Sequence, residues 1–244
     1  MQKAILHIKD EVNVRFEGLD VSTRRKISDK LKYFVPYAYH MPAYKLGRWD
    51  GFVRFCDIGA RTSLNLIDKI LPIIEQQGYE IEIKDDRKEY KFDFEKVDQE
   101  YFSQINWPKG HTHEGQPIIL RDYQIQVIND FISNPQCLQE VATGAGKTII
   151  TACLSKICQS YGRTIVIVPN KSLVTQTEED YKNVGLDVGV YFGERKELNH
   201  KHTICTWQSL NVLHKKTKKV EADFPLDEFL DDVVCVMVDE VHMA

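Results

Sequence analysis

A glycine-rich segment at residues 142–148, Ala-Thr-Gly-Ala-Gly-Lys-Thr, constrains the fold of this chain more than any other feature. It matches the pattern Gly, four residues, Gly-Lys-Ser/Thr, except that Val141 occupies the position of the first glycine. An apolar run at 137–141 precedes it, and a helical pattern at 147–160 follows it. In that context backbone N–H groups surround phosphate oxygens at a helix N-terminus, whose dipole attracts negative charge. The segment predicts a nucleotide-phosphate loop; the simpler alternative is a glycine turn between a strand and a helix.

Two acidic residues supply the other half of the predicted site. Asp239 and Glu240 follow the apolar run 233–238, and acids at the carboxyl end of a parallel strand lie beside such a loop. Asp239 would bind Mg²⁺ together with the Thr148 hydroxyl, while Glu240 would orient and deprotonate the attacking water. Lys147 would reach the β- and γ-phosphates of ATP, so Lys147, Asp239 and Glu240 are the predicted catalytic residues. The alternative is that the acids only stabilise the start of a helix. The loop residues predicted to hold the nucleotide are Thr143, Gly144, Ala145, Gly146, Lys147 and Thr148.

The second half of the chain predicts an α/β fold. Continuous apolar strands that alternate with helices are typical of a parallel sheet covered on both faces. The expected strands are 137–141, 164–168, 203–206 and 233–238, and the expected helices are 147–160 and one that begins at Ser172. We place this domain at residues 118–244.

The first half predicts a separate, small α+β domain at residues 1–84. Alternating apolar residues indicate a hairpin at 4–8 and 12–16, a strand at 51–56 and a strand at 79–83. Helices are expected from Ser22 to Phe34 and over residues 64–77. Residues 85–117 are charged and punctuated by Pro and Gly, which predicts a linker with one short helix near residues 94–102.

Composition excludes several classes of protein. No apolar run approaches the roughly 20 residues of a membrane span, and the N-terminus lacks a secretory signal, so no membrane partner is expected. The six cysteines include no Cys-x-x-Cys pair, which favours reduced thiols in a cytoplasm. Cys137, Cys153, Cys205 and Cys235 lie in apolar runs that predict core positions. Residues 1–84 carry 14 basic against 11 acidic residues, which weakly favours a polyanionic partner.

Two histidine pairs and a lysine run have less specific meanings. His111 and His113, and His200 and His202, have spacings seen in metal sites, but no cysteine or carboxylate partners accompany them. We expect histidines of flexible loops. Residues 215–219, Lys-Lys-Thr-Lys-Lys, predict a solvated loop, with phosphate contact as the alternative.

Together the motifs resemble the first RecA-like motor domain of superfamily 2 helicases and translocases. Asp-Glu-Val-His at 239–242 resembles the second nucleotide motif of that family, and Leu-Arg-Asp-Tyr-Gln at 120–124 resembles its adenine-recognising segment. The resemblance implies that Gln124 bonds the adenine edge, supported by Arg121 or Tyr123, and that His242 couples the ATP site to nucleic acid.

Two further segments resemble the family's nucleic-acid motifs, at 168–176 and 206–210. Both place small polar groups and backbone amides at strand ends, which suits contact with phosphates rather than reading of bases. For Trp207 we expect a packing role ahead of base stacking. The residues that the resemblance assigns to nucleic acid are Pro169, Asn170, Lys171, Gln176, Thr206, Trp207 and Gln208.

A segment of the first domain indicates which group of helicases within this superfamily the chain resembles. Residues 44–55, Tyr-Lys-Leu-Gly-Arg-Trp-Asp-Gly-Phe-Val-Arg-Phe, resemble a segment of the N-terminal domain of UvsW-type recombination helicases of tailed phages. The resemblance implies action on duplex or branched DNA in recombination, repair or fork processing, with Arg48 and Arg54 as phosphate contacts. The alternative for this segment is a solvated basic face around a structural Trp49.

The sequence stops two residues after His242, whereas the resembled family continues with a coupling motif and a second RecA-like domain. We therefore expect an incomplete first motor domain that binds ATP weakly and hydrolyses it slowly or not at all without a second domain. A shortened protein, an interrupted gene product and one half of a split enzyme all remain open. So do a restriction-type or RNA-directed translocase, and a DNA-binding protein that retains the ATP fold without motor activity.

Overall fold

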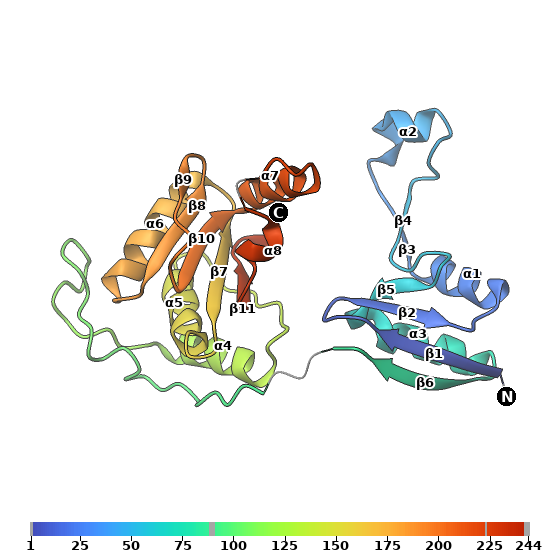
Figure 1. Cartoon of the computed structure of the whole chain (residues 1–244). Coiled ribbons are helices and arrows are strands. Elements are labelled where there is room, and N and C mark those ends of the chain that lie inside the picture. Colours follow the sequence, from blue (N-terminus) through green and yellow to red (C-terminus); the bar gives the residue numbers. More distant parts are fainter. Residues whose placement is uncertain (1, 88–90, 223, 242–244) are drawn as a thin grey trace. The chain divides into compact units, whose positions relative to one another are not determined.

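The structure is a computed structural model that describes residues 2–87, 91–222 and 224–241. The chain divides into two compact units, Met1–Lys91 and Phe92–Ala244 (Figure 1). The sequence predicted a linker over residues 85–117, but the second unit already begins at Phe92. Val97 and Phe102 are buried in the hydrophobic core of that unit, which explains why this part of the predicted linker is folded. The short helix predicted near residues 94–102 is replaced there by extended chain and turns.

The first unit is a small α+β fold, as the sequence predicts. Its sheet has the order β5-β2-β1-β6, in which β1 pairs antiparallel with β2 and parallel with β6. Two helices, α1 and α3, contribute Ile27, Ile70 and Ile74 to one core with the buried side of the sheet. The elements are β1 (Gln2–Ile8), β2 (Asn13–Glu17), α1 (Val21–Lys30), β3 (Lys32–Phe34), η1 (Ala38–His40), α2 (Pro42–Lys45), β4 (Phe52–Arg54), β5 (Arg61–Ser63), η2 (Leu64–Leu66), α3 (Ile67–Gln76) and β6 (Tyr79–Asp85).

The helix predicted from Ser22 to Phe34 is shorter at its end. Asp20, rather than Ser22, caps α1, because its side chain accepts a hydrogen bond from the Thr23 backbone N–H at 2.7 Å. After Lys30 the chain leaves the helix and forms β3, which pairs antiparallel with β4. Aromatic residues favour strands, so Tyr33 and Phe34 join this two-stranded ribbon.

The second unit contains the predicted α/β sheet. Four strands run parallel in the order β11-β7-β10-β8, and β9 adds an antiparallel edge. The predicted helix at 147–160 is confirmed as α5, and the helix predicted from Ser172 is α6. The elements are α4 (Asp122–Ser133), α5 (Lys147–Cys158), β7 (Arg163–Val168), α6 (Lys171–Asn183), β8 (Val188–Phe192), β9 (Arg195–Lys196), β10 (His202–Thr206), α7 (Trp207–Lys218), α8 (Leu226–Phe229) and β11 (Val233–Val238).

Helices cover both faces of this sheet, because alternate residues of each strand enter different cores (Figure 1). On β7, Val166 and Val168 pack with helices α4, α5 and α6. Ile165 instead packs with Leu213 of α7 and Phe229 of α8. The carboxyl ends of the parallel strands therefore meet at one edge of a sheet that is buried on both sides.

The strand predicted at 137–141 is wrong. This segment forms no ladder, Leu138 is 82% exposed, and Cys137 is exposed rather than in the core. In the described part of the sheet, β11 pairs with β7 and has no second neighbour. An apolar run forms a strand only where another strand supplies hydrogen-bond partners, so the segment before the loop stays extended and unpaired.

The structure also adds a hairpin that the sequence analysis missed. β8 and β9 pair antiparallel between Tyr191 and Lys196. The signal was present, since residues 188–192 are β-branched or aromatic apart from one glycine and are bounded by Gly185 and Gly193. Within the described residues, no helix is long and apolar enough to span a membrane.

His202 is a core residue rather than the loop histidine that was expected. It is fully buried on β10, where Nδ1 shares a 2.8 Å hydrogen bond with the Thr164 hydroxyl. Burial lowers the pKa of the His202 imidazole from 6.5 to about 4. The ring is therefore neutral in the folded protein at neutral pH.

The stability of the fold should consequently depend on pH through His202. Between pH 6.5 and 4 the unfolded state binds the proton and the folded state does not, so stability falls as pH falls and is independent of this group above pH 6.5. We expect a loss of about 1 kcal/mol per pH unit in this window. Urea unfolding from pH 7 to pH 4.5 measures it. His202→Gln should flatten the dependence and His214→Gln, on the exposed side of α7, should not; equal slopes in all three proteins would contradict the prediction.

Candidate functional site

The phosphate loop lies at the N-terminus of α5, as predicted. Gly146 is the N-cap of that helix with φ +81°, and Gly144 has φ +78°. Both values lie in the left-handed region that glycine adopts at little cost. Ile150, buried under the first turn, anchors the helix in the core. The loop therefore presents the N–H groups that an α-helix leaves unpaired at its start.

Lys147 meets both predicted acids. Its Nζ forms an ion pair with Glu240, and it lies 3.9 Å from Asp239 Oδ1. The hydrogen bond to Glu240 raises the pKa of Lys147 above its usual value, and the Asp239 carboxylate adds to this effect. About a quarter of each of the three side chains is exposed. The structure thus brings together the three residues that were predicted to be catalytic, although Lys147 and Glu240 lie 93 positions apart in sequence.

The backbone around the acids is held by the neighbouring strand. Asp239 N–H donates to the Ile167 carbonyl at 2.9 Å, which continues the parallel pairing of β11 with β7. Glu240 has φ +51°, an uncommon conformation for a residue with a side chain. Its N–H donates to Asp239 Oδ1 at 3.0 Å, so this turn is stabilised locally.

Two of the predicted adenine-segment residues, Tyr123 and Gln124, contact the phosphate loop, and Arg121 supports both of them. Gln124 is buried at the start of α4, and its Nε2 donates to the Ala145 carbonyl at 2.9 Å. The Tyr123 hydroxyl donates to the same carbonyl at 2.7 Å, and Arg121 donates to the Tyr123 oxygen at 3.0 Å. Gln124 Oε1 in turn accepts from the Arg121 N–H at 2.9 Å. The segment therefore braces the loop, while its contact with a base stays a prediction.

The predicted Mg²⁺ ligands suit that ion. Thr148 follows Lys147 in the first turn of α5, and Asp239 faces the same lysine, so a hydroxyl and a carboxylate belong to one site. Mg²⁺ is usually held by one or two carboxylates together with substrate phosphates. The described residues contain no cluster of three or more His, Cys, Asp or Glu that would hold a metal without a substrate.

The predicted nucleic-acid residues lie at the ends of two neighbouring strands. Asn170 and Thr206 are the N-caps of α6 and α7, and their side chains accept from Leu173 N–H at 3.0 Å and Ser209 N–H at 3.3 Å. Gln208 Nε2 lies 3.5 Å from the Pro169 carbonyl, which links the two segments. Asn170 and Thr206 therefore have a structural role, and contact with nucleic acid stays a prediction.

The other residues of these segments are accessible. Lys171 and Gln176 are exposed on α6, and Trp207 is 39% exposed at the start of α7. The expected packing role of Trp207 accounts for only part of its surface. The lysine run at 215–219 is the last turn and cap of α7 rather than a loop.

In the first unit the expected structural role of Trp49 agrees with its contacts. Its indole N–H donates to the Phe52 carbonyl at 2.9 Å, next to the β3–β4 ribbon. Arg54 forms an ion pair with Asp50, whereas Arg48 is exposed. Their contact with DNA stays a prediction, and His242, the predicted coupling residue, lies outside the described residues.

Comparisons with known proteins agree with this geometry. The ATP-dependent DNA helicase uvsW of Enterobacteria phage T4 is 24% identical over 250 residues, covering 98% of this chain and 46% of that protein. The chain thus spans about half the length of this curated relative. A crystal structure of the UvsW helicase from bacteriophage T4 matches with a TM-score of 0.71 at 20% identity, covering 99% of this chain and 84% of the other.

A second crystal structure, of T4 UvsW, matches with a TM-score of 0.70 at 18% identity, over 99% of this chain and 53% of the other. These matches confirm the predicted fold class and the resemblance to UvsW-type helicases. Residues 117–244 match the family described as "Type III restriction enzyme, res subunit". Because that match covers more than half of the chain and includes the phosphate loop and the acids, the chain belongs to the type III restriction enzyme res subunit family.

Proposed function

We propose that this chain forms the N-terminal portion of an ATP-driven DNA helicase or translocase, comprising a DNA-binding unit and the first ATP-binding motor unit. The observation that carries the proposal is the contact of Lys147 with Asp239 and Glu240 at the N-terminus of α5. A cation, two acids and a helix N-terminus are the groups that bind ATP phosphates and position water. The similarity to the phage T4 DNA helicase supports DNA as the partner.

The ion pair suggests an order of events on the protein. Glu240 orients and deprotonates water only after it releases Lys147, and the γ-phosphate is the competing anion that draws the lysine away. Thr148 and Asp239 would hold Mg²⁺, which neutralises charge that develops on the phosphates. The contact with Glu240 raises the pKa of Lys147, so the lysine enters this exchange as a cation. ATP binding thereby frees the base at the moment when its substrate arrives.

Full activity, in this proposal, requires a second RecA-like domain in cis or in trans. The described site sets one cation, Lys147, against the two acids Asp239 and Glu240, and a second domain would add positive charge to it. An arginine supplied by another domain contributes about 10³- to 10⁵-fold in rate in related phosphoryl transfers. We therefore propose slow hydrolysis by this chain alone, and action on duplex or branched DNA in the cytoplasm, in recombination, repair or fork processing.

Removal of the Lys147 charge should weaken ATP binding. Lys147→Ala is expected to weaken binding of a fluorescent ATP analogue by about 10-fold or more, because a charge-assisted hydrogen bond contributes about 1.5–3 kcal/mol. Lys69→Ala, on α3 of the first unit, removes the same charge and should leave the affinity unchanged. Equal affinities of the Lys147 variant and the wild type would contradict the proposed site.

Glu240→Gln should separate binding from hydrolysis. The amide keeps the size of the side chain but cannot take a proton, so ATP affinity should be kept and turnover should fall by about 100-fold or more. DNA-stimulated ATP hydrolysis is measured with a second RecA-like domain added in trans. Wild-type turnover in the variant would remove Glu240 from the mechanism. If the wild-type chain mixed with the second domain also fails to hydrolyse ATP, the proposed role of that domain is contradicted.

The contact of Gln124 with the loop is tested by two glycine substitutions. A Cβ at Gly146 would lie 2.6 Å from Gln124 Nε2, whereas a Cβ at Gly144 meets nothing within 4 Å. Both positions have positive φ, so both alanines share a backbone cost of about 1–2 kcal/mol. Gly146→Ala must also displace the buried Gln124 amide and lose its bond to Ala145, about 1 kcal/mol more. Urea unfolding should show a lower stability for Gly146→Ala than for Gly144→Ala, and ATP titration should show a lower affinity. The reverse order contradicts the bracing role of Gln124.

A further inference from the structure

A cavity of about 300 Å³ opens in the second unit between the β8–β9 hairpin and α7. Tyr191 of β8 lies on one wall, Val212 of α7 lies on another, and Phe224 lines it from the segment before α8. Tyr191 and Phe224 contact each other edge to face, with ring centroids 5.9 Å apart. Val212 is 53% exposed, whereas Tyr191 is 6% exposed, so the cavity is open to solvent beside α7 and Tyr191 forms its inner wall. The cavity thus offers aromatic and aliphatic surface to a flat ring.

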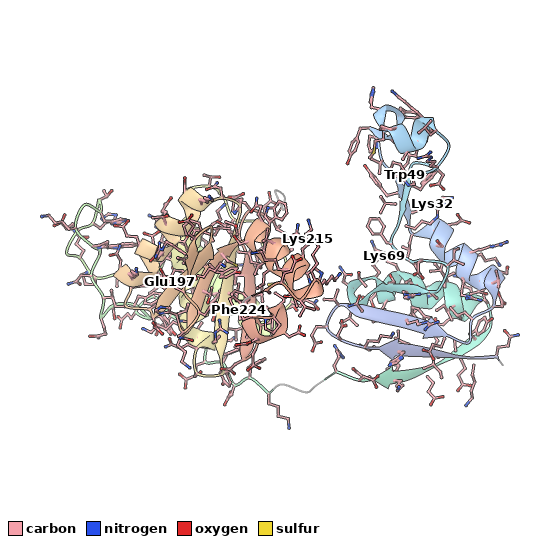
Figure 2. All side chains as sticks on the ribbon, turned by 45° about the horizontal axis from the view of Figure 1, so that its top comes forward. Lys32, Trp49, Lys69, Glu197, Lys215 and Phe224 are labelled. Carbon is pink, nitrogen blue, oxygen red and sulfur yellow. The ribbon has the colours of Figure 1, made fainter. Side chains whose placement is uncertain are left out.

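Positive charge lines the same cavity. Lys196 of β9 and Lys216 of α7 are on opposite walls, and none of the described lining residues is a carboxylate. Lys216 belongs to the lysine-rich last turn of α7, where Figure 2 labels its neighbour Lys215. An aromatic lining between two cations suits a ligand that is both flat and anionic.

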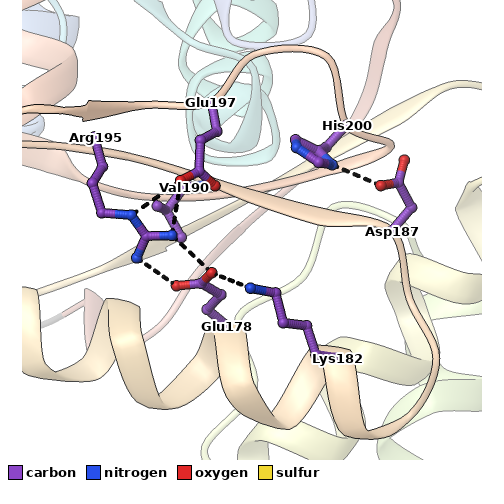
Figure 3. Close-up of polar contacts among 7 residues, drawn as sticks. All are labelled: Glu178, Lys182, Asp187, Val190, Arg195, Glu197 and His200. Carbon is purple, nitrogen blue, oxygen red and sulfur yellow. Dashed lines mark hydrogen bonds and ion pairs between the residues drawn. The ribbon is translucent and has the colours of Figure 1, made fainter.

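Ion pairs around the buried carboxylate of Glu178 fix the hairpin wall (Figure 3). Arg195 forms two hydrogen bonds, at 2.8 and 2.9 Å, with the carboxylate of Glu178 on α6, and another at 2.8 Å with Glu197. The Glu178 side chain is 6% exposed, and the bonds from Arg195 hold its pKa at about 2. Because side chains alternate along a strand, Arg195 and Glu197 on the α6 side leave Lys196 on the side of the cavity. The network therefore sets the position of one of the two cations.

The cavity adjoins the strand ends that were predicted to meet nucleic acid. Gln208 lines it and also contacts the Pro169 carbonyl. Gly193 lines it as well, and a Cβ at that position would lie 3.8 Å from Lys171 Nζ. A nucleic-acid strand that crosses these strand ends would pass the mouth of the cavity.

We propose that this cavity binds one nucleotide of single-stranded DNA, with the base against Tyr191 and Phe224 and a phosphate between Lys196 and Lys216. The inference rests on the proposed function and extends it from backbone contact to capture of an unpaired base. A paired base is stacked within its duplex and cannot enter without being flipped out. The cavity would therefore distinguish unpaired from paired DNA.

The first test asks whether the base matters. Fluorescence anisotropy without ATP compares a 15-nucleotide oligothymidylate with an abasic oligomer of equal length. Phe224→Leu, which keeps apolar volume but removes the ring, should weaken thymidylate binding by about fivefold or more and leave abasic binding unchanged. Phe131→Leu, the same substitution on α4 outside the cavity, should change neither. Equal affinity of the wild type for both oligomers would overturn the proposal.

The second test asks whether the charge acts in the cavity or over the whole surface. Lys216→Ala should weaken binding of both oligomers by about fivefold or more, while Lys215→Ala, its neighbour on the same helix, should have less than a twofold effect. Equal losses in the two variants would indicate diffuse electrostatic attraction and would overturn the proposal.

Failure of the inference can be told apart from failure of the proposed function. ATP binding depends on Lys147, and cavity variants should leave it unchanged. If Lys147→Ala weakens ATP binding while the cavity variants bind thymidylate like the wild type, only the cavity proposal fails. If thymidylate binding follows the cavity residues while Lys147→Ala leaves ATP binding intact, the cavity stands as a DNA site without the motor.

Discussion

The ion pair between Lys147 and Glu240 is the contact on which the predicted ATP site depends. It joins the N-terminus of α5 to the end of β11, two segments that meet only because the sheet aligns them. β11 pairs with β7 in parallel up to Val238, and Asp239 continues that pairing through Ile167. The α5 helix packs on the same sheet through Ile150 and Leu154. Core packing thus determines which charges face each other at the edge.

The predicted site includes residues with an uncommon backbone conformation. Gly144, Gly146 and Glu240 all have positive φ, and for Glu240 the conformation carries a cost that glycine avoids. Local hydrogen bonds offset the cost, since Glu240 N–H is satisfied by Asp239 and the loop carbonyl of Ala145 accepts from Gln124. Uncommon backbone that persists because its surroundings hold it is a frequent property of functional sites. These hydrogen bonds therefore hold the backbone of the predicted site in place.

The sequence predicted the apolar strands that find a neighbour in the sheet. The runs at 164–168, 203–206 and 233–238 became strands because each pairs in parallel; the first two are largely buried, whereas Val236 and Val238 of the third are exposed. The run at 137–141 contains Gln139 and Glu140 and has no strand beside it, and pairing partners cannot be read from a single segment. His202 was misjudged for a related reason. Its polar neighbours suggested a loop, whereas Thr164, contributed by β7, satisfies its ring inside the core.

The roles of site residues could be predicted from sequence where the chemistry of the residue allows few alternatives. Lys147, Asp239 and Glu240 have few alternative roles at such spacing, and the structure brings them together. Asn170 and Thr206 are different, because a small polar residue at a strand end is equally suited to cap the next helix.

Helix capping by Asn170 and Thr206 is compatible with a role of their segments in nucleic-acid contact, however. Capping occupies the side-chain oxygens but orients the first turns of α6 and α7 at neighbouring strand ends, β7 and β10. Both helices then direct the positive ends of their dipoles toward the same edge of the sheet. A chain with a net charge of -4 can in this way present a local surface that attracts phosphates. On the proposed function, sequence-independent contact with DNA would come from these backbone ends, and the capping side chains would act by holding them in place.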